Sequence, residues 1–317
     1  MVTTTDKPLI VLVGPTASGK TSLALRLAEQ FNGEIVSCDS VAVYREMEIG
    51  TAKPSHEERA LIQHHMIDIA WPDESCTAGD YSRQAREALT GITERGNTPI
   101  VAGGTGLYLR ALIDGLFPAP AQKPGQRERL RKLATTRGAA WLHRILKRLD
   151  PTAAAAIHAN DVPKVIRAIE VSLAADQPLT QQWQKGRDAL TGYRILRLGL
   201  NPPRARLYER INQRAAAMFD RGLIEETERL IARYGADCRP FTSLGYAEAS
   251  AVLRNEITRE QAVAQAQQGH RNYAKRQLTW FRREPNIHWL EGDGGDTIIA
   301  DQALHLVATH LKATQHS

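Results

Sequence analysis

The chain of 317 residues has an apolar fraction of 42%, a charged fraction of 24% and a net charge of +6, a composition typical of a soluble globular protein with one large or two ordinary domains. No apolar run is long enough to span a bilayer, and the first residues lack the basic and apolar regions of a signal peptide. We therefore expect a cytoplasmic protein without a membrane partner. Three scattered cysteines without a C-x-x-C pair argue against a disulfide framework and a thiolate zinc site.

The first predicted elements are a strand, a glycine-rich loop and a helix. An apolar run at residues 9–13 precedes Gly-Pro-Thr-Ala-Ser-Gly-Lys-Thr at residues 14–21, and an amphipathic stretch follows at 22–28. This is the G-x-x-x-x-G-K-T spacing of a phosphate-binding loop, in which backbone amides surround an anion, Lys20 adds positive charge and the Thr21 hydroxyl can bind Mg²⁺. The loop predicts binding of a di- or triphosphate without saying which one.

Further apolar runs at residues 34–38, 98–102 and 195–200 predict buried parallel strands, and a helix is expected at 82–95. Alternating strands and helices indicate an α/β fold, with helices on both faces of a parallel sheet. Ligands of such sheets bind beyond the carboxyl ends of the strands. Asp39 follows the second strand and Thr105 the third, so we expect Lys20, Asp39 and Thr105 to converge on one site.

The composition changes near residue 117. Residues 117–120 resemble a linker, and residues 123–148 contain nine Lys or Arg and one acid in a helical pattern that continues to about residue 183. We therefore expect a helical insertion at 121–192 in a phosphate-loop core formed by 1–120 and 193–317. A helix at 270–284 would also carry cations on one face. Two basic surfaces near a phosphate site favour a large polyanion as partner.

Several candidate residues have a structural alternative. Asp39 is a proton acceptor, a partner of Mg²⁺-bound water or a turn carboxylate, and Thr105 is a site residue or a turn hydroxyl. Arg210 and Arg214 lie four residues apart on a predicted helix. They either clamp a diphosphate or pair with neighbouring glutamates.

Seven further segments accompany the phosphate loop. They are residues 39–40 with 43–45, 50–54, 64–65 with 67–68, 103–108, 165–170, 245–246, and 273–282 with the sequence Tyr-Ala-Lys-Arg-Gln-Leu-Thr-Trp-Phe-Arg. Together, these segments resemble the bacterial tRNA dimethylallyltransferases (tRNA isopentenyltransferases) of the IPP transferase family. The set spans about nine-tenths of the chain and is more specific than the phosphate loop alone.

The resemblance implies a reaction, its substrates and the residues that bind them. The exocyclic amine of the adenine 3′ of the tRNA anticodon would attack dimethylallyl diphosphate, and pyrophosphate would leave. Asp39 would be the general base, Thr105 would position it or the nucleotide, and Lys20 and Mg²⁺ on Thr21 would stabilise the leaving group. The expected diphosphate-binding residues are Gly14, Pro15, Thr16, Ala17, Ser18, Gly19, Lys20, Thr21 and Arg214. The expected tRNA-binding residues are Asp39, Ser40, Val41, Ala42, Thr105, Arg127, Pro163, Lys164, Val165, Ile166, Arg167, Phe241, Gly245, Tyr246, Lys275, Arg276, Gln277, Trp280 and Arg282.

The sequence departs from the family pattern at four positions. Ala42 stands where Gln is usual, Lys164 where Arg or Gln is common, Ala247 where a basic residue is common, and His270 where Thr is usual. These departures concern individual tRNA contacts and leave the reaction intact.

We expect a monomer. The alternatives are an adenylate isopentenyltransferase, a P-loop kinase of small metabolites and a non-catalytic RNA-binding protein; the first of these would not need the two basic surfaces.

Overall fold

The computed structural model describes residues 6–51, 53–117, 120, 124–184 and 186–315. The chain forms two compact units, one made of Met1–Ile113 with Leu190–Ser317 and the other of Asp114–Ala189. The amide of Leu190 donates a hydrogen bond of 2.8 Å to the carbonyl oxygen of Ile113, so the first unit closes on itself where the second is inserted. Two residues of the predicted linker, 118 and 119, lie outside the described residues.

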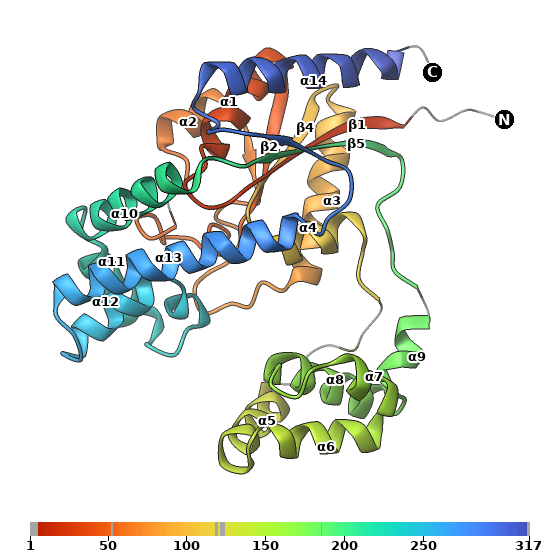
Figure 1. The fold of residues 1–317 in the computed structure, drawn as a ribbon, viewed down its shortest axis with the longest axis vertical. Helices are drawn as coiled ribbons and strands as arrows, with labels where there is room; N and C mark the ends of the chain where they lie inside the picture. Colours follow the sequence, from red (N-terminus) through yellow and green to blue (C-terminus); the bar gives the residue numbers. More distant parts are fainter. Residues whose placement is uncertain (1–5, 52, 118–119, 121–123, 185, 316–317) are drawn as a thin grey trace. The chain divides into compact units, whose positions relative to one another are not determined.

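A six-stranded parallel sheet forms the centre of the first unit, in the order β3-β2-β4-β1-β5-β6 (Figure 1). The strands are β1 (Lys7–Val13), β2 (Gly33–Cys38), β3 (His64–His65), β4 (Thr98–Gly103), β5 (Tyr193–Leu200) and β6 (Ile287–Leu290). The four predicted strands and the α/β class are confirmed. The sequence did not predict β3 and β6, because each is short and contains polar residues at the edge of the sheet.

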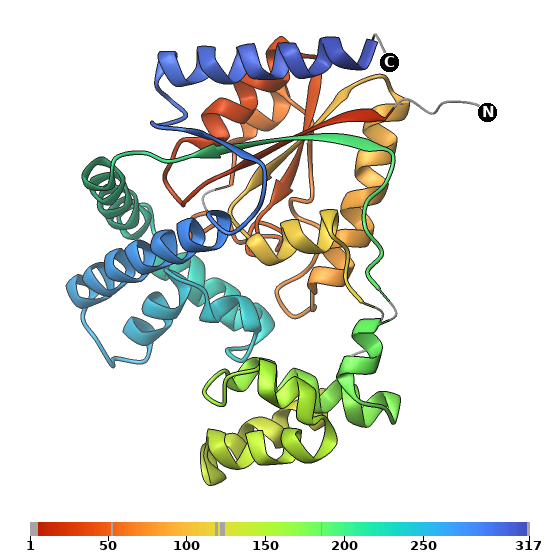
Figure 2. The ribbon, with the colours of Figure 1, turned by 45° about the vertical axis from the view of Figure 1, so that its right-hand side comes forward.

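Helices cover both faces of this sheet because strand side chains alternate between them. Ile10 and Leu12 pack in one core with α1 (Lys20–Gln30) and α14 (Thr297–Gln315). The alternate residues of β1, Leu9, Val11 and Val13, pack in the other core with α3 (Ala78–Glu94) and α4 (Gly106–Ile113). Figure 2 shows α1 and α14 on one side of the strands and α3 on the other. A further helix, α2 (His56–Leu61), comes before β3 in the chain.

The C-terminal helices of this unit follow the carboxyl end of β5. They are α10 (Arg204–Asp220), α11 (Leu223–Tyr234), the 3-10 turn η1 (Arg239–Thr242), α12 (Tyr246–Leu253) and α13 (Arg259–Phe281). A small apolar cluster with Leu207, Ile211 and Ala274 joins α10 to α13. Helix α13 ends at Phe281, so the predicted basic helix is shorter at its C-terminus than expected, and Arg282 is its cap.

In the described residues of the second unit, all regular secondary structure is helical. Its helices are α5 (Pro124–Arg137), α6 (Ala139–Leu149), α7 (Pro151–Ala156), α8 (Val162–Ala175) and α9 (Leu179–Gln184). They enclose a separate core that includes Leu142, Leu146, Val165 and Ile169. Each unit therefore buries an apolar core of its own. Among the described residues, no helix combines the length and the apolar character that crossing a lipid bilayer requires.

Candidate active site

The phosphate loop connects the end of β1 to the start of α1. Its backbone conformation depends on Gly19, whose φ is +81° and whose Cβ, if present, would lie 2.5 Å from Asp293 Oδ1. Any side chain at this position would be strained and would collide with a second loop. That second loop also bonds the first directly, because the amide of Gly294 donates to the carbonyl oxygen of Ser18 at 2.9 Å.

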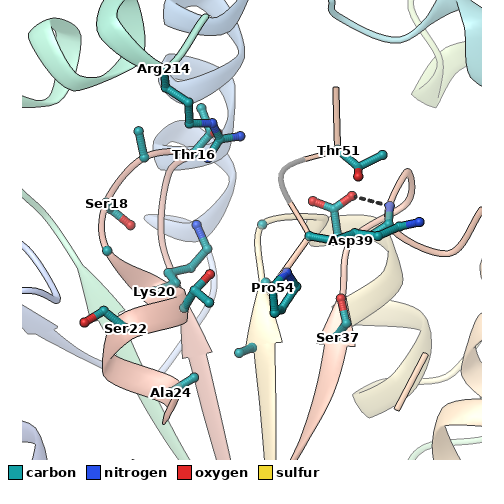
Figure 3. Close-up of a pocket in the computed structure, with 18 of the residues that line it drawn as sticks. Thr16, Ser18, Lys20, Ser22, Ala24, Ser37, Asp39, Thr51, Pro54 and Arg214 are labelled. Atoms are coloured by element: carbon teal, nitrogen blue, oxygen red, sulfur yellow. Dashed lines mark hydrogen bonds between the residues drawn. The ribbon is translucent and has the colours of Figure 1, made fainter. Parts of the chain in front are cut away.

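A cavity of about 840 Å³ opens over the phosphate loop (Figure 3). Residues 16–22 and 24 form one wall, and Ser37, Asp39, Thr51 and Pro54 lie across the cavity from Lys20. Residues 102–104 at the end of β4 also line it, together with Arg210 and Arg214 from α10 and Tyr273 and Gln277 from α13. The expected convergence of Lys20 and Asp39 on one site is therefore observed in the structure.

Two of the cations that line the cavity, Lys20 and Arg214, differ in their partners. The Lys20 ammonium donates to the carbonyl oxygens of Gly14 and Pro15 at 3.0 and 2.7 Å. Burial lowers the pKa of Lys20 to about 8, and the neighbouring Arg214 charge acts in the same direction. Lys20 is thus protonated at neutral pH. Arg214 makes no hydrogen bond or ion pair with the described part of the chain, and burial lowers the pKa of its guanidinium.

Of the two arginines considered on α10, Arg210 has a partner that the sequence did not predict. Its Nη1 atom lies 2.7 Å from Asp293 Oδ2, in an ion pair with a carboxylate 83 residues away in the sequence. The expected alternatives for both arginines were neighbouring glutamates. Arg210 is thus tied to the C-terminal loop, whereas the Arg214 guanidinium points toward the phosphate loop (Figure 3).

Asp39 forms a turn and also lines the cavity. Its Oδ1 atom accepts hydrogen bonds from the amides of Val41 and Ala42 at 2.8 and 3.2 Å. No hydrogen bond to its Oδ2 atom is formed within the described residues. The turn alternative considered for Asp39 is therefore observed, and it leaves one carboxylate oxygen available to a ligand.

Thr105 adjoins the Asp39 turn. Its hydroxyl oxygen accepts a hydrogen bond from the amide of Ser40 at 3.1 Å, and its own amide donates to the carbonyl oxygen of Cys38 at 3.1 Å. Thr105 is not among the residues that line the cavity. It thus holds the backbone on both sides of Asp39, in keeping with a positioning role.

Two residues of α13, Tyr273 and Gln277, line the site. Gln277 accepts from the amide of Thr16 at 2.8 Å and donates to the carbonyl oxygen of Gly104 at 2.9 Å, so it joins the phosphate loop to the loop after β4. Burial raises the pKa of Tyr273 to about 12, and the nearby Asp39 charge acts in the same direction. Sequence reasoning missed Tyr273 as a lining residue, because its position on the helix is next to the apolar arc.

Some of the expected tRNA-binding residues of the first unit are exposed to solvent and others are buried. Lys275, Arg276 and Arg282 are exposed, and the ring of Trp280 lies 4.4 Å below the Arg110 guanidinium. Side chains that the structure buries are those of Ala42, Phe241, Tyr246 and Gln277. Phe241 and Tyr246 are outside the cavity lining and support neighbouring parts of the chain, whereas Ala42 and Gln277, although buried, line the cavity.

In the second unit, Arg127 is engaged inside the helical bundle. Its guanidinium donates to both carboxylate oxygens of the buried Glu170 at 2.9 and 2.8 Å. Arg167 Nη1 lies 3.9 Å from the same carboxylate. Val165 and Ile166 belong to the core, whereas Pro163 and Lys164 are exposed. To contact tRNA as expected, Arg127 would have to give up its two hydrogen bonds to Glu170.

Comparison with known proteins gives a consistent result. Residues 42–284 match the family model described as IPP transferase. The chain is 60% identical over 304 residues to a tRNA dimethylallyltransferase of Koribacter versatilis, covering 96% of this chain and 99% of that protein. The structure matches that of the tRNA isopentenylpyrophosphate transferase of Bacillus halodurans with a TM-score of 0.71 and 37% identity, covering 98% of each chain. It also matches a eukaryotic dimethylallyltransferase, solved acting on tRNA, with a TM-score of 0.82 and 25% identity over 97% of this chain and 80% of that one. The chain belongs to the IPP transferase family.

Proposed function

We propose that this protein is a tRNA dimethylallyltransferase. It transfers the dimethylallyl group of dimethylallyl diphosphate to the exocyclic amine of the adenine 3′ of the anticodon and releases pyrophosphate. The observation that carries the proposal is the cavity in which Lys20 and Arg214 lie across from the Asp39 carboxylate. A diphosphate on the cationic side would place its allylic carbon toward the carboxylate, and an amine entering there would be next to a proton acceptor.

The reaction needs one bond formed, one bond broken and one proton removed. The amine nitrogen bonds to the allylic carbon, the carbon–oxygen bond to the diphosphate breaks, and the electron pair leaves with pyrophosphate. Asp39 takes the proton from the amine through its Oδ2 atom, since its Oδ1 atom is held by two amides. Thr105 supports this geometry by binding the amide of Ser40.

The leaving pyrophosphate needs distributed positive charge. The loop amides, the Lys20 ammonium and the Arg214 guanidinium supply it in a partly enclosed site, where such interactions are stronger than in water. Thr21 is exposed to the cavity and offers one hydroxyl ligand. The described residues contain no group of three or more His, Cys, Asp or Glu side chains that could hold a metal ion. A single hydroxyl ligand from the protein suits Mg²⁺, because this ion keeps several waters and binds through substrate phosphates. When bound, its charge would favour departure of pyrophosphate.

The tRNA would be held by exposed cations of both units. Lys275, Arg276 and Arg282 lie at the C-terminal end of α13. In the second unit, Arg129, Arg131, Lys132, Arg137, Arg144, Lys147 and Arg148 are exposed. Such contacts to phosphates give affinity and register, and the adenine in a single-stranded loop can leave its stack at modest cost.

The direct test incubates the protein with Mg²⁺, dimethylallyl diphosphate and unmodified tRNA, and then analyses the nucleosides by mass spectrometry. We expect adenosine carrying one dimethylallyl group, with AMP and ATP inert as acceptors in parallel reactions. Product on AMP or ATP would instead identify an adenylate isopentenyltransferase. Absence of any prenylated product, with ATP turnover, would overturn the proposal in favour of a kinase.

A further inference from the structure

The loop between β6 and α14 packs directly behind the phosphate loop. It lies beyond residue 284, where the match to the family model ends. Its amide at Gly294 bonds the carbonyl oxygen of Ser18, and Asp293 lies so close to Gly19 that no side chain fits between them. This loop thus touches the anion-binding loop although no recognised motif includes it.

Asp293 is the most buried charged residue of this loop, with 2% of its surface exposed. Its Oδ1 atom accepts a hydrogen bond of 2.8 Å from the amide of Gly295, and its Oδ2 atom lies 2.7 Å from Arg210 Nη1. A buried carboxylate is costly in free energy unless a cation pairs with it. Arg210 is that cation.

Arg210 lies one helical turn before Arg214 on α10, and both side chains line the cavity. The Arg210 side chain is 43% exposed, so without a partner it would occupy many rotamers and lose entropy on binding a ligand. The ion pair with Asp293 removes much of that freedom in advance. Such preorganisation favours ligand binding because the cost of ordering is met before the ligand arrives.

We propose that Asp293 is a positioning residue for the diphosphate. It holds the Arg210 guanidinium beside the phosphate loop, so that Arg210 and Arg214 together bind the diphosphate of the donor and the released pyrophosphate. This inference rests on the proposed function for the identity of the donor, but it concerns pyrophosphate binding, which is measurable without turnover.

The test compares four variants of the full-length protein: Asp293→Asn, Arg210→Gln, the double variant and Arg206→Gln. Asparagine keeps the size of the side chain and the acceptor for the Gly295 amide but removes the charge. Arg206 is the matched control, because it lies one turn before Arg210, is exposed, and contacts Asp296 of the same loop at 3.4 Å. Calorimetric titration with inorganic pyrophosphate and Mg²⁺ gives the dissociation constant, and kinetics give KM and kcat for both substrates.

We expect Asp293→Asn and Arg210→Gln each to raise the pyrophosphate dissociation constant and the KM for dimethylallyl diphosphate about tenfold, as is typical for one charge-assisted hydrogen bond. The KM for tRNA should not change. The double variant should be no weaker than either single variant, because both remove the same interaction. Arg206→Gln should resemble the wild type.

Unchanged pyrophosphate affinity in Asp293→Asn and Arg210→Gln, with only a lower melting temperature, would assign the pair a purely structural role and overturn the proposal. If Asp293→Asn does not fold, the half-exposed Arg210→Gln variant can still overturn the proposal: unchanged pyrophosphate affinity there would leave Asp293 without a ligand-binding cation to position. A wild-type protein that binds pyrophosphate but does not prenylate tRNA would overturn the proposed function, while the titration would still decide the role of Asp293.

Discussion

The two oxygens of the Asp39 carboxylate have different surroundings. Oδ1 is held by the amides of Val41 and Ala42, and Oδ2 remains available. We predict that Asp39→Asn keeps the turn, since an amide oxygen accepts the same two hydrogen bonds, but lowers kcat by about 10²- to 10⁴-fold because no proton acceptor remains. Single-turnover prenylation of tRNA measures this loss.

Pyrophosphate affinity is the control for that variant. The Asp39 charge acts on Lys20 and Arg214 across the cavity, so its loss removes a negative charge from the site and should not weaken pyrophosphate binding. Near-normal kcat in Asp39→Asn would show that another group removes the proton.

Lys20 gives the site a pH dependence. Its pKa of about 8 in the ligand-free protein is below the usual range for lysine because of burial and the Arg214 charge. Pyrophosphate binds better when Lys20 is protonated. Its affinity is therefore highest well below pH 8 and decreases as the pH rises through 8 and Lys20 loses its proton. We predict that the pyrophosphate dissociation constant increases steadily between about pH 8 and pH 10.

The matched variant is Lys20→Arg, whose guanidinium stays protonated throughout this range. Its affinity should be weaker but nearly independent of pH between 7 and 10. A wild-type affinity that is flat over the same interval would mean that Lys20 does not contact the pyrophosphate.

At the scale of whole elements, α11 and α12 hold the wall of the cavity that contains Thr51. The buried Glu226 of α11 accepts from the amides of Glu48 and Ile49 at 3.3 and 3.1 Å, and from the Tyr246 hydroxyl of α12 at 2.6 Å. The Tyr246 ring occupies the space beside Gly50, where a Cβ atom would lie 2.3 Å from it. Tyr246 therefore acts on the site through the backbone that it supports.

We predict that Glu226→Ala lowers the free energy of unfolding by about 2–4 kcal/mol, because it leaves buried donors without an acceptor. Chemical denaturation measures this change. Glu228→Ala, at an exposed position of the same helix, should change the stability by less than about 0.5 kcal/mol. Equal effects of the two substitutions would contradict the importance of the buried hydrogen bonds.

The sequence predicted those elements whose residues repeat a strong local pattern. The apolar strands and the phosphate loop are local signals, and parallel topology was enough to bring Lys20 and Asp39 together. The ion pair between Arg210 and Asp293 and the contacts of Gln277 join segments far apart in the chain, and no periodicity encodes such pairs. Likewise, helical spacing shows that Arg127 is on a basic helix but not that Glu170 holds it.

For the molecule as a whole, the second unit contributes exposed cations and cations that are held in internal ion pairs. Arg131 and Lys132 are exposed on α5, whereas Arg127 on the same helix pairs with the buried Glu170. We predict that replacing Arg131 and Lys132 by Ala weakens tRNA binding and reduces the slope of log K against log salt by about two, one for each phosphate that is no longer neutralised. Titrations at several salt concentrations measure this slope.

Arg127→Ala is the informative comparison for that prediction. It should mainly destabilise the helical unit, because Glu170 would remain as a poorly compensated buried charge. A salt slope unchanged in the Arg131 and Lys132 double variant would mean that the exposed face of α5 does not contact tRNA.

The discontinuous first unit has a consequence for synthesis on the ribosome. Strand β1 pairs with β4 on one side and with β5 on the other, and the whole second unit is translated between those two partners. The roughly 90 residues between them take about 5 to 20 s to synthesise at ordinary rates of translation, and during this time the apolar β1 has one unpaired edge. Such an edge favours pairing with other chains. The nascent protein is therefore most prone to aggregation while its helical unit is being translated, and its need for a chaperone is greatest in that interval.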